Sequence, residues 1–393
     1  MKVLKTLGMV LFCLLLLSGA CVLAIFIVKP QWLGMNKETE TVEVIEPEVE
    51  KEEAEEVVPE PLSRAEEILN TMSLEEKIGQ IFFVRWPETD LEATMALHPG
   101  GLLMFAQDFE GLNRTQVQEK IAAAQSLSST PLLIGVDEEG GIVNRVSLNP
   151  QLVPTPFPSA QALYNEGGLP EVAQDAKTKS SYLLDLGINV NLAPVADVAY
   201  DPNDYMYSRT VGLDAQNTAE YVATVVDAMN QSGIGSCLKH FPGYGNNIDT
   251  HQEIAVDQRD RSVFESEDFL PFKAGIEHDA PAILVAHNIV TCFDDVPASL
   301  SKTVHDVLRN ELGFEGVILS DDLFMEAIRQ FTNGEDPSVQ AFLAGNDLLT
   351  ITDFEQGYAS IKQAVSDGVI TEAMLDESIL RILNWKLELG LLK

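Results

Sequence analysis

A short polar stretch, KHFPGYGNNIDTH at positions 239–251, gathers residue types that can move a proton. Lys239 and His240 follow an apolar run, and a turn-forming segment then leads to Asp249 and His251. The spacing of these last two residues suits a turn in which the carboxylate meets an imidazole nitrogen. Such an anion raises the pKa of the imidazole and fixes its tautomer, so that the other ring nitrogen can act as a general acid near neutral pH.

A second candidate, Asp321, is the first charged residue after the apolar run at 316–320. A carboxylate in this position can attack an anomeric carbon, coordinate a metal ion or cap the following helix. A zinc site formed by His240, Asp249 and His251 is an alternative, because all three are ligand types, although they lack the HxxxH or HExxH spacing of helical zinc sites. A purely structural histidine also remains open at this point.

The elements that must position these residues alternate between apolar strands and amphipathic helices. Near-continuous apolar strands between helical segments indicate a parallel sheet, and eight such units over about 330 residues predict a (β/α)8 barrel of the TIM type in the α/β class. The predicted strands are 78–86, 100–108, 131–137, 188–197, 234–241, 282–290, 316–322 and 346–352.

Polar side chains follow these predicted strands at a common end. Barrel enzymes place their chemistry at the C-terminal ends of the strands, so this distribution predicts a catalytic mouth there. The residues concerned are Asp137, Asp197, Lys239, His240, His287, Asp321 and Asp353.

The N-terminal region has a different character. Residues 7–28 carry no charge and are long enough to cross a bilayer as a helix, so we expect a membrane anchor preceded by a cytoplasmic segment, 1–6. A lipoprotein signal with Cys21 as the lipidated residue is the alternative. Residues 29–62 are acidic and predict a disordered stalk, which leaves 63–393 as a single catalytic domain at the cell membrane, on its extracellular side.

Composition excludes some classes of partner. The formal net charge is −36, which argues against a nucleic-acid partner because phosphate binding requires clustered lysine and arginine. The four cysteines, at positions 13, 21, 237 and 292, have neither zinc-site spacing nor a disulfide framework.

Eight segments in order resemble the motifs of glycoside hydrolase family 3, in its single-domain β-N-acetylhexosaminidase branch. The opening stretch resembles KH(F/I)PG-x-G…D(S/T)H of that family, and MSLEEKIGQIFF at 72–83 resembles its first helix and strand. The other similar segments are GVDEEGGIVNRV (135–146), NLAPVADV (191–198), SRTVGLD (208–214), VAH (285–287), VILSDDLFM (317–325) and AGNDLL (344–349). Tyr244 departs from the pattern, because many relatives have histidine there.

The resemblance implies a retaining exo-β-N-acetylglucosaminidase that hydrolyses terminal β-linked GlcNAc of peptidoglycan fragments or another cell-wall glycan, with no metal and no other cofactor. It implies Asp321 as the nucleophile that forms a glycosyl-aspartate, and His251 with Asp249 as the acid/base dyad. It also implies that the substrate sugar is bound by Asp137, Arg145, Arg209, Lys239 and His240.

Two other functions stay open. One is a GlcNAc phosphorylase on the same scaffold, because a histidine acid/base repels an incoming phosphate less than a glutamate does. A catalytically idle wall-binding protein is the other, and the presence of Asp321, Asp249 and His251 argues against it.

Overall fold

The strands of the chain lie side by side in one parallel sheet. The structure is a computed structural model, and it describes residues 62–245 and 254–393. Eight strands pair in the order β10-β1-β2-β3-β4-β5-β7-β9. Their bounds are β1 (Phe82–Arg85), β2 (Gly101–Met104), β3 (Leu133–Val136), β4 (Val190–Asn191), β5 (Gly235–Phe241), β7 (Ala282–Val285), β9 (Val317–Ser320) and β10 (Leu349–Ile351).

Backbone contacts between the two ends of this strand order close the sheet. The Ser320 amide donates to the Leu348 carbonyl at 3.1 Å, and the Leu323 amide donates to the Thr350 carbonyl at 3.0 Å. These bonds join β9 to β10, so that every strand has two neighbours. The predicted (β/α)8 barrel is confirmed, and each of its eight strands overlaps one of the predicted segments.

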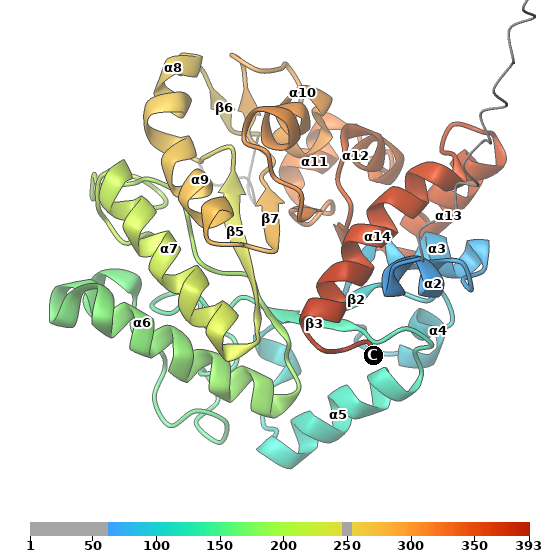
Figure 1. The fold of residues 1–393 in the computed structure, drawn as a ribbon, viewed down its shortest axis with the longest axis horizontal. Helices are drawn as coiled ribbons and strands as arrows, with labels where there is room; N and C mark the ends of the chain where they lie inside the picture. The colour runs from blue at the N-terminus through green and yellow to red at the C-terminus, as the bar shows by residue number, and fades with distance from the viewer. Residues whose placement is uncertain (1–61, 246–253) are drawn as a thin grey trace, which may run out of the picture. The chain divides into compact units, whose positions relative to one another are not determined.

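Helices surround the barrel and follow one another around the strands in chain order (Figure 1). Their ends carry the expected caps: Asp214 accepts from the Asn217 amide at the start of α7, and Gly233 ends α7 with a φ of 76°. The helices are α2 (Arg64–Leu69), α3 (Leu74–Gln80), α4 (Leu91–Met95), α5 (Arg114–Ser126), α6 (Ala160–Leu186), α7 (Ala215–Ser232), α8 (Arg261–Val263), α9 (Phe269–Glu277), α10 (Lys302–Asp306), α11 (Glu326–Phe331), α12 (Ser338–Ala344), α13 (Phe354–Ser366) and α14 (Glu372–Glu388), with short helical turns η1 (Ala106–Asp108), η2 (Phe264–Asp268), η3 (Ala298–Leu300) and η4 (Val307–Glu311).

The lumen of the barrel is filled by side chains rather than left as a channel. The ring of Phe83 occupies the space beside Gly135, where an added Cβ would lie 2.3 Å from the ring. Trp385 of α14 belongs to the same buried group, and an added Cβ at Gly235 would lie 2.8 Å from its ring. Helix α14 therefore closes the lumen at the N-terminal ends of the strands, opposite the mouth.

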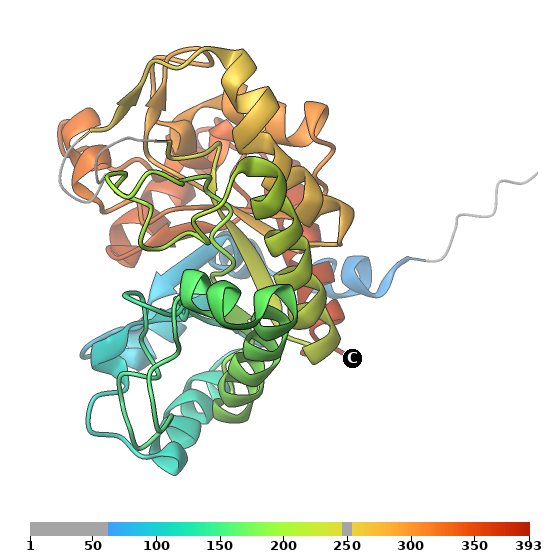
Figure 2. The ribbon, with the colours of Figure 1, turned by 90° about the vertical axis from the view of Figure 1, so that its left-hand side faces the viewer.

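Figure 2 shows the two ends of the barrel, with the light-blue arrow of β1 directed to the left and the red helix α14 at the other end. The short strands β6 (Val256–Asp257) and β8 (Ile289–Val290) pair in parallel at the left-hand end. This small sheet was not predicted.

Several predicted strands are longer than the observed ones; the segment 100–108, for example, ends in the helical turn η1. The segment 282–290 does not form one strand, because β7 ends at Val285 and Ile289–Val290 belongs to the small sheet with β6. In the segment 78–86, the first residues complete α3, whose start is fixed by the Ser73–Glu76 capping box. Helix α3 is followed by β1 after a single residue, Ile81, and no charged residue marks the boundary, so the sequence pattern assigned the end of the helix to the strand.

The predicted anchor at 7–28, the segment 1–6 and nearly all of the stalk at 29–62 lie outside the described residues. Within the part of the chain that the structure describes, no helix is both long and apolar enough to span a bilayer.

Candidate active site

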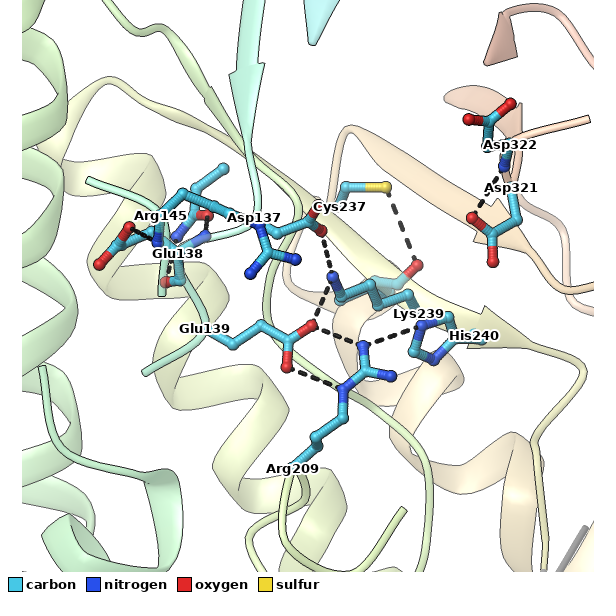
Figure 3. Close-up of polar contacts among 12 residues, drawn as sticks. Asp137, Glu138, Glu139, Arg145, Arg209, Cys237, Lys239, His240, Asp321 and Asp322 are labelled. Atoms are coloured by element: carbon cyan, nitrogen blue, oxygen red, sulfur yellow. Dashed lines mark hydrogen bonds and ion pairs between the residues drawn. The ribbon is translucent and has the colours of Figure 1, made fainter. Parts of the chain in front are cut away.

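Strand alternation places the polar candidates at the mouth of the barrel. Cys237 and Leu319 belong to the buried core of the lumen. Because side chains on one face of a strand are two residues apart, Lys239 and Asp321 come next on the lumen side, at the C-terminal ends of β5 and β9. Figure 3 shows both side chains in one region.

Lys239 joins two carboxylates that come from the loop after β3. Its Nζ donates to Asp137 Oδ1 at 2.6 Å and lies 2.6 Å from Glu139 Oε1. Burial disfavours the charged amine, but the two carboxylates outweigh burial and hold the pKa of Lys239 above its usual value. The Lys239 amine therefore stays protonated, near the C-terminal end of β5 at the mouth of the barrel.

Glu139 also binds Arg209, through two hydrogen bonds. Arg209 Nη2 donates to Glu139 Oε1 at 2.7 Å, and its Nε donates to Oε2 at 3.1 Å. Burial raises the pKa of Glu139, but Lys239 and Arg209 reverse this effect and keep its pKa well below the usual range. The carboxylate stays ionised and fixes both cations, as the dashed lines in Figure 3 show.

His240 is oriented by a fully buried carboxylate. Asp197 Oδ2 lies 2.7 Å from His240 Nδ1 and accepts from the His240 amide at 3.1 Å, while Oδ1 accepts from the Tyr244 amide at 2.8 Å. The Nδ1 nitrogen is thus the one that carries a proton, and Nε2 lies 3.3 Å from Arg209 Nη2. We call Asp137, Glu139, Arg209, Lys239 and His240 the Lys239 cluster.

Arg145 stands on a loop that folds around a different glutamate. The buried carboxylate of Glu138 accepts from the amides of Arg145 and Val146 at 2.8 and 2.7 Å, and from Ser147. The Arg145 Nη1 donates to the Asn144 carbonyl at 3.1 Å, while its Nε is buried and without a hydrogen bond in the structure. Figure 3 shows the side chain extending toward the Lys239 cluster.

The two consecutive aspartates after β9 have different surroundings. Asp322 accepts from Thr352 Oγ1 at 2.8 Å and from the Phe324 amide at 2.9 Å, so its carboxylate holds the loop. Burial raises the pKa of Asp322. Asp321 is oriented by backbone contacts, since its amide donates to the Val285 carbonyl at 3.0 Å and its Oδ1 accepts from the Asp322 amide at 2.8 Å.

The structure thus brings together most of the predicted site residues that it describes. Lys239 contacts Asp137, Arg209 contacts His240, and Glu139 joins the two pairs, while Arg145 and Asp321 border the same region. Asp249 and His251 lie outside the described residues, and so does the alternative zinc site that would need them. Within 62–245 and 254–393, no group of three or more His, Cys, Asp or Glu side chains is arranged to hold a metal ion.

Other polar residues at the strand ends have structural contacts. Asp353 caps α13 by accepting from the Gln356 amide, and His287 Nε2 lies 2.9 Å from the Asp322 carbonyl. Conversely, Glu139 was not predicted although it lies in the GVDEEGG segment. Three acidic residues follow one another there: Asp137 and Glu139 both contact Lys239, whereas Glu138 accepts from the amides of the Arg145 loop.

Comparison with known proteins identifies relatives of the whole barrel. Residues 73–385 match the model described as the glycosyl hydrolase family 3 N terminal domain. A beta-hexosaminidase of Xanthomonas campestris pv. campestris (strain B100) is 35% identical over 281 residues, which cover 70% of this chain and 83% of that protein.

Two solved structures are also similar. A glycoside hydrolase family 3 beta-N-acetylglucosaminidase from Paenibacillus sp. str. FPU-7 superposes with a TM-score of 0.76 at 29% identity, over 81% of this chain and 63% of that chain. A beta-N-acetylhexosaminidase from Beutenbergia cavernae DSM 12333 gives a TM-score of 0.71 at 26% identity, over 80% of this chain and 98% of that chain.

Proposed function

The chain belongs to glycosyl hydrolase family 3, and from this premise we propose that it is a retaining exo-β-N-acetylglucosaminidase. The predicted family is confirmed by the match over residues 73–385. The relatives named beta-hexosaminidase and beta-N-acetylglucosaminidase support GlcNAc as the terminal sugar that this enzyme releases.

The observation that carries the proposal is the placement of Asp321 beside the Lys239 cluster at the barrel mouth (Figure 3). A sugar ring presents hydroxyl groups that both donate and accept hydrogen bonds. The Lys239 cluster offers both kinds of partner, with its carboxylates and cations already held by one another. Preorganised groups lose little conformational entropy on binding, so they can hold the ring while Asp321 reaches the anomeric carbon.

In the proposed mechanism, Asp321 attacks the anomeric carbon and forms a glycosyl ester. His251, supported by Asp249, gives a proton to the leaving oxygen and then takes one from the water that breaks the ester. The placement of Asp321 on the lumen side of β9 favours it for the attack, whereas the Asp322 carboxylate holds the loop through Thr352 and the Phe324 amide.

The setting of the enzyme is a further part of the proposal. The uncharged segment 7–28 and the acidic segment 29–62 suggest a barrel held outside the cell membrane, where peptidoglycan fragments with terminal GlcNAc are available. No cofactor is needed for the proposed steps.

A panel of aryl β-glycosides tests this function. The full-length protein should hydrolyse the GlcNAc glycoside in preference to those of GalNAc, glucose and xylose, and NMR should detect the β-anomer of GlcNAc as the first product. Inverted product or absence of GlcNAc release would contradict the proposal. In phosphate buffer, accumulation of GlcNAc-1-phosphate would instead identify a phosphorylase.

A further inference from the structure

Arg259, in the loop between β6 and α8, joins two buried carboxylates outside the Lys239 cluster. Its Nε donates to Asp257 Oδ2 at 2.9 Å, and its Nη1 donates to Asp268 Oδ2 at 2.8 Å. Its guanidinium carbon also lies 4.3 Å from the centroid of the Phe264 ring. Hydrogen bonds to two carboxylates and a contact with an aromatic ring together hold the guanidinium in one orientation.

The turn that follows β5 packs directly on this group of side chains. A Cβ added at Gly245 would lie 2.6 Å from the Arg259 guanidinium carbon, and one added at Gly243 would lie 2.2 Å from Asp268 Oδ1. Both glycines have a positive φ, 56° at Gly245 and 124° at Gly243. Only glycine combines this backbone conformation with so close an approach, so the turn is fitted to Arg259 and Asp268.

The same arginine also holds the chain beyond residues 246–253. Asp257 is the last residue of β6, and its Oδ1 accepts from the Arg259 amide at 2.9 Å. The Asp257 carbonyl accepts from the Thr291 amide at 2.9 Å, next to the pairing of β6 with β8. Arg259 therefore connects Gly245, which precedes 246–253, with the strand that follows this segment.

We propose that Arg259 is a positioning residue for the acid/base step, because it fixes the backbone on both sides of the segment that contains Asp249 and His251. This inference rests on the proposed function, in which His251 gives a proton to the leaving oxygen. Residues 246–253 connect the two fixed ends, and a chain of given length has a limited reach, so a displaced end changes where His251 can be placed. A displacement of about 1 Å can lower the rate of a positioned reaction by about 100-fold.

Substitution of Arg259 leaves two buried carboxylates, and one of them can be neutralised. Burial raises the pKa of Asp268 to about 7 even with Arg259 beside it. Without the arginine this pKa rises further, so Asp268 takes up a proton rather than remaining as an unpaired buried charge. We therefore expect Arg259→Met to fold, which allows its kinetics to be measured.

Two substrates with the same terminal GlcNAc and different leaving groups test the role of Arg259. The disaccharide N,N′-diacetylchitobiose needs a proton on its leaving oxygen, whereas p-nitrophenolate leaves without one. In full-length Arg259→Met, kcat/KM for chitobiose should fall by about 10- to 100-fold, and kcat/KM for the p-nitrophenyl glycoside should fall by less than about 3-fold. The ratio kcat/KM is the appropriate measure because it covers the steps up to the glycosyl ester, in which the two leaving groups differ.

Arg261→Met is the matched control. Arg261 also binds two carboxylates, Glu265 and Glu311, and its guanidinium carbon lies 5.5 Å from the centroid of an aromatic ring, Phe293. The three atoms nearest to a Cβ added at Gly245, however, all belong to Arg259. Arg261→Met should therefore keep the wild-type kcat/KM on both substrates.

Three results would overturn the role of Arg259 while leaving the proposed function intact. They are unchanged kinetics in Arg259→Met, an equal fall on both substrates in Arg259→Met, and a selective fall on chitobiose in Arg261→Met that matches the fall in Arg259→Met. An equal fall on both substrates in folded His251→Ala would instead contradict the proposed acid/base step itself. A wild type that releases no GlcNAc from either substrate would overturn both the function and the inference.

Arg259→Lys covers the case in which Arg259→Met does not fold. Lysine keeps a positive charge between Asp257 and Asp268, but it lacks the planar fork that bonds both carboxylates and packs on Gly245. Its kcat/KM should fall at least about 5-fold more on chitobiose than on the p-nitrophenyl glycoside. A wild-type ratio between the two substrates in folded Arg259→Lys would overturn the inference.

Discussion

Lys386 in α14 is a buried lysine at the end of the barrel opposite the mouth. Its substitution should change the stability of the protein by an amount that depends on pH. The side chain is fully buried, and its Nζ donates to Gln80 Oε1 at 2.8 Å. No carboxylate is within ion-pair distance of it in the structure. Burial therefore lowers the pKa of Lys386 to about 7, from 10.5 for an exposed lysine.

The sign of the effect follows from proton binding. Between pH 7 and 10.5 the unfolded chain keeps the proton on Lys386 and the folded chain releases it, so the free energy of unfolding rises with pH. The shift corresponds to a penalty of about 4–5 kcal/mol at or below neutral pH, at roughly 1.4 kcal/mol per pKa unit. Lys386→Met removes this penalty, while the lost hydrogen bond to Gln80 costs about 1–2 kcal/mol at every pH.

Urea unfolding of wild type and Lys386→Met at pH 7 and 9.5 measures the effect. The stability advantage of the variant should shrink by about 3 kcal/mol over this interval, because the wild type is relieved of its penalty. Lys77→Met is the control: Lys77 is buried near α14 but bonds Glu372 and Asp376, which raise its pKa, so its difference from wild type should stay constant. A constant difference for Lys386→Met as well would refute the reasoning.

Three further predictions concern the site and the lumen. Glu139→Gln should raise KM and lower stability by about 3–5 kcal/mol, because buried Lys239 and Arg209 lose their shared carboxylate. The stability loss should be constant above pH 4.5 and shrink below it, since the pKa of Glu139 is lowered by folding; a loss that persists in acid would contradict this. Gly235→Ala should lower stability by about 1–3 kcal/mol through its clash with Trp385, which thermal unfolding measures, and an unchanged melting temperature would argue against it. His251→Ala should lose far more rate on chitobiose than on a p-nitrophenyl glycoside, about 10²–10⁴-fold on chitobiose, because nitrophenolate leaves without a proton; equal losses in a folded variant would remove His251 from the acid/base role.

The barrel was predictable because its strands are buried on both faces. Continuous apolar runs such as Leu133–Val136 and the one that ends at Ser320 predict a parallel sheet, and residue types at the ends of the helices between them predict the helix caps. The small sheet of β6 and β8 was missed because each strand has two residues, too few for any periodic pattern. Its pairing depends on tertiary contacts, such as the bond from the Ile289 amide to the Ala255 carbonyl.

The site was predictable in its residue types and less so in its connections. Lys239 and Asp321 could be placed at the mouth, because each follows an apolar strand. The central position of Glu139, between Lys239 and Arg209, depends on contacts with residues 70 and 100 positions away in the sequence.

Trapping of the covalent intermediate tests the central claim that Asp321 is the nucleophile of a retaining β-N-acetylglucosaminidase. The full-length protein is incubated with a 5-fluoro-N-acetylglucosaminyl fluoride, digested and analysed by mass spectrometry, with Asp321→Asn as the unlabelled control. We expect one added 5-fluoro-N-acetylglucosaminyl group, located on Asp321. A label on Asp322 or on another residue, or labelling of Asp321→Asn at the wild-type rate, would contradict it.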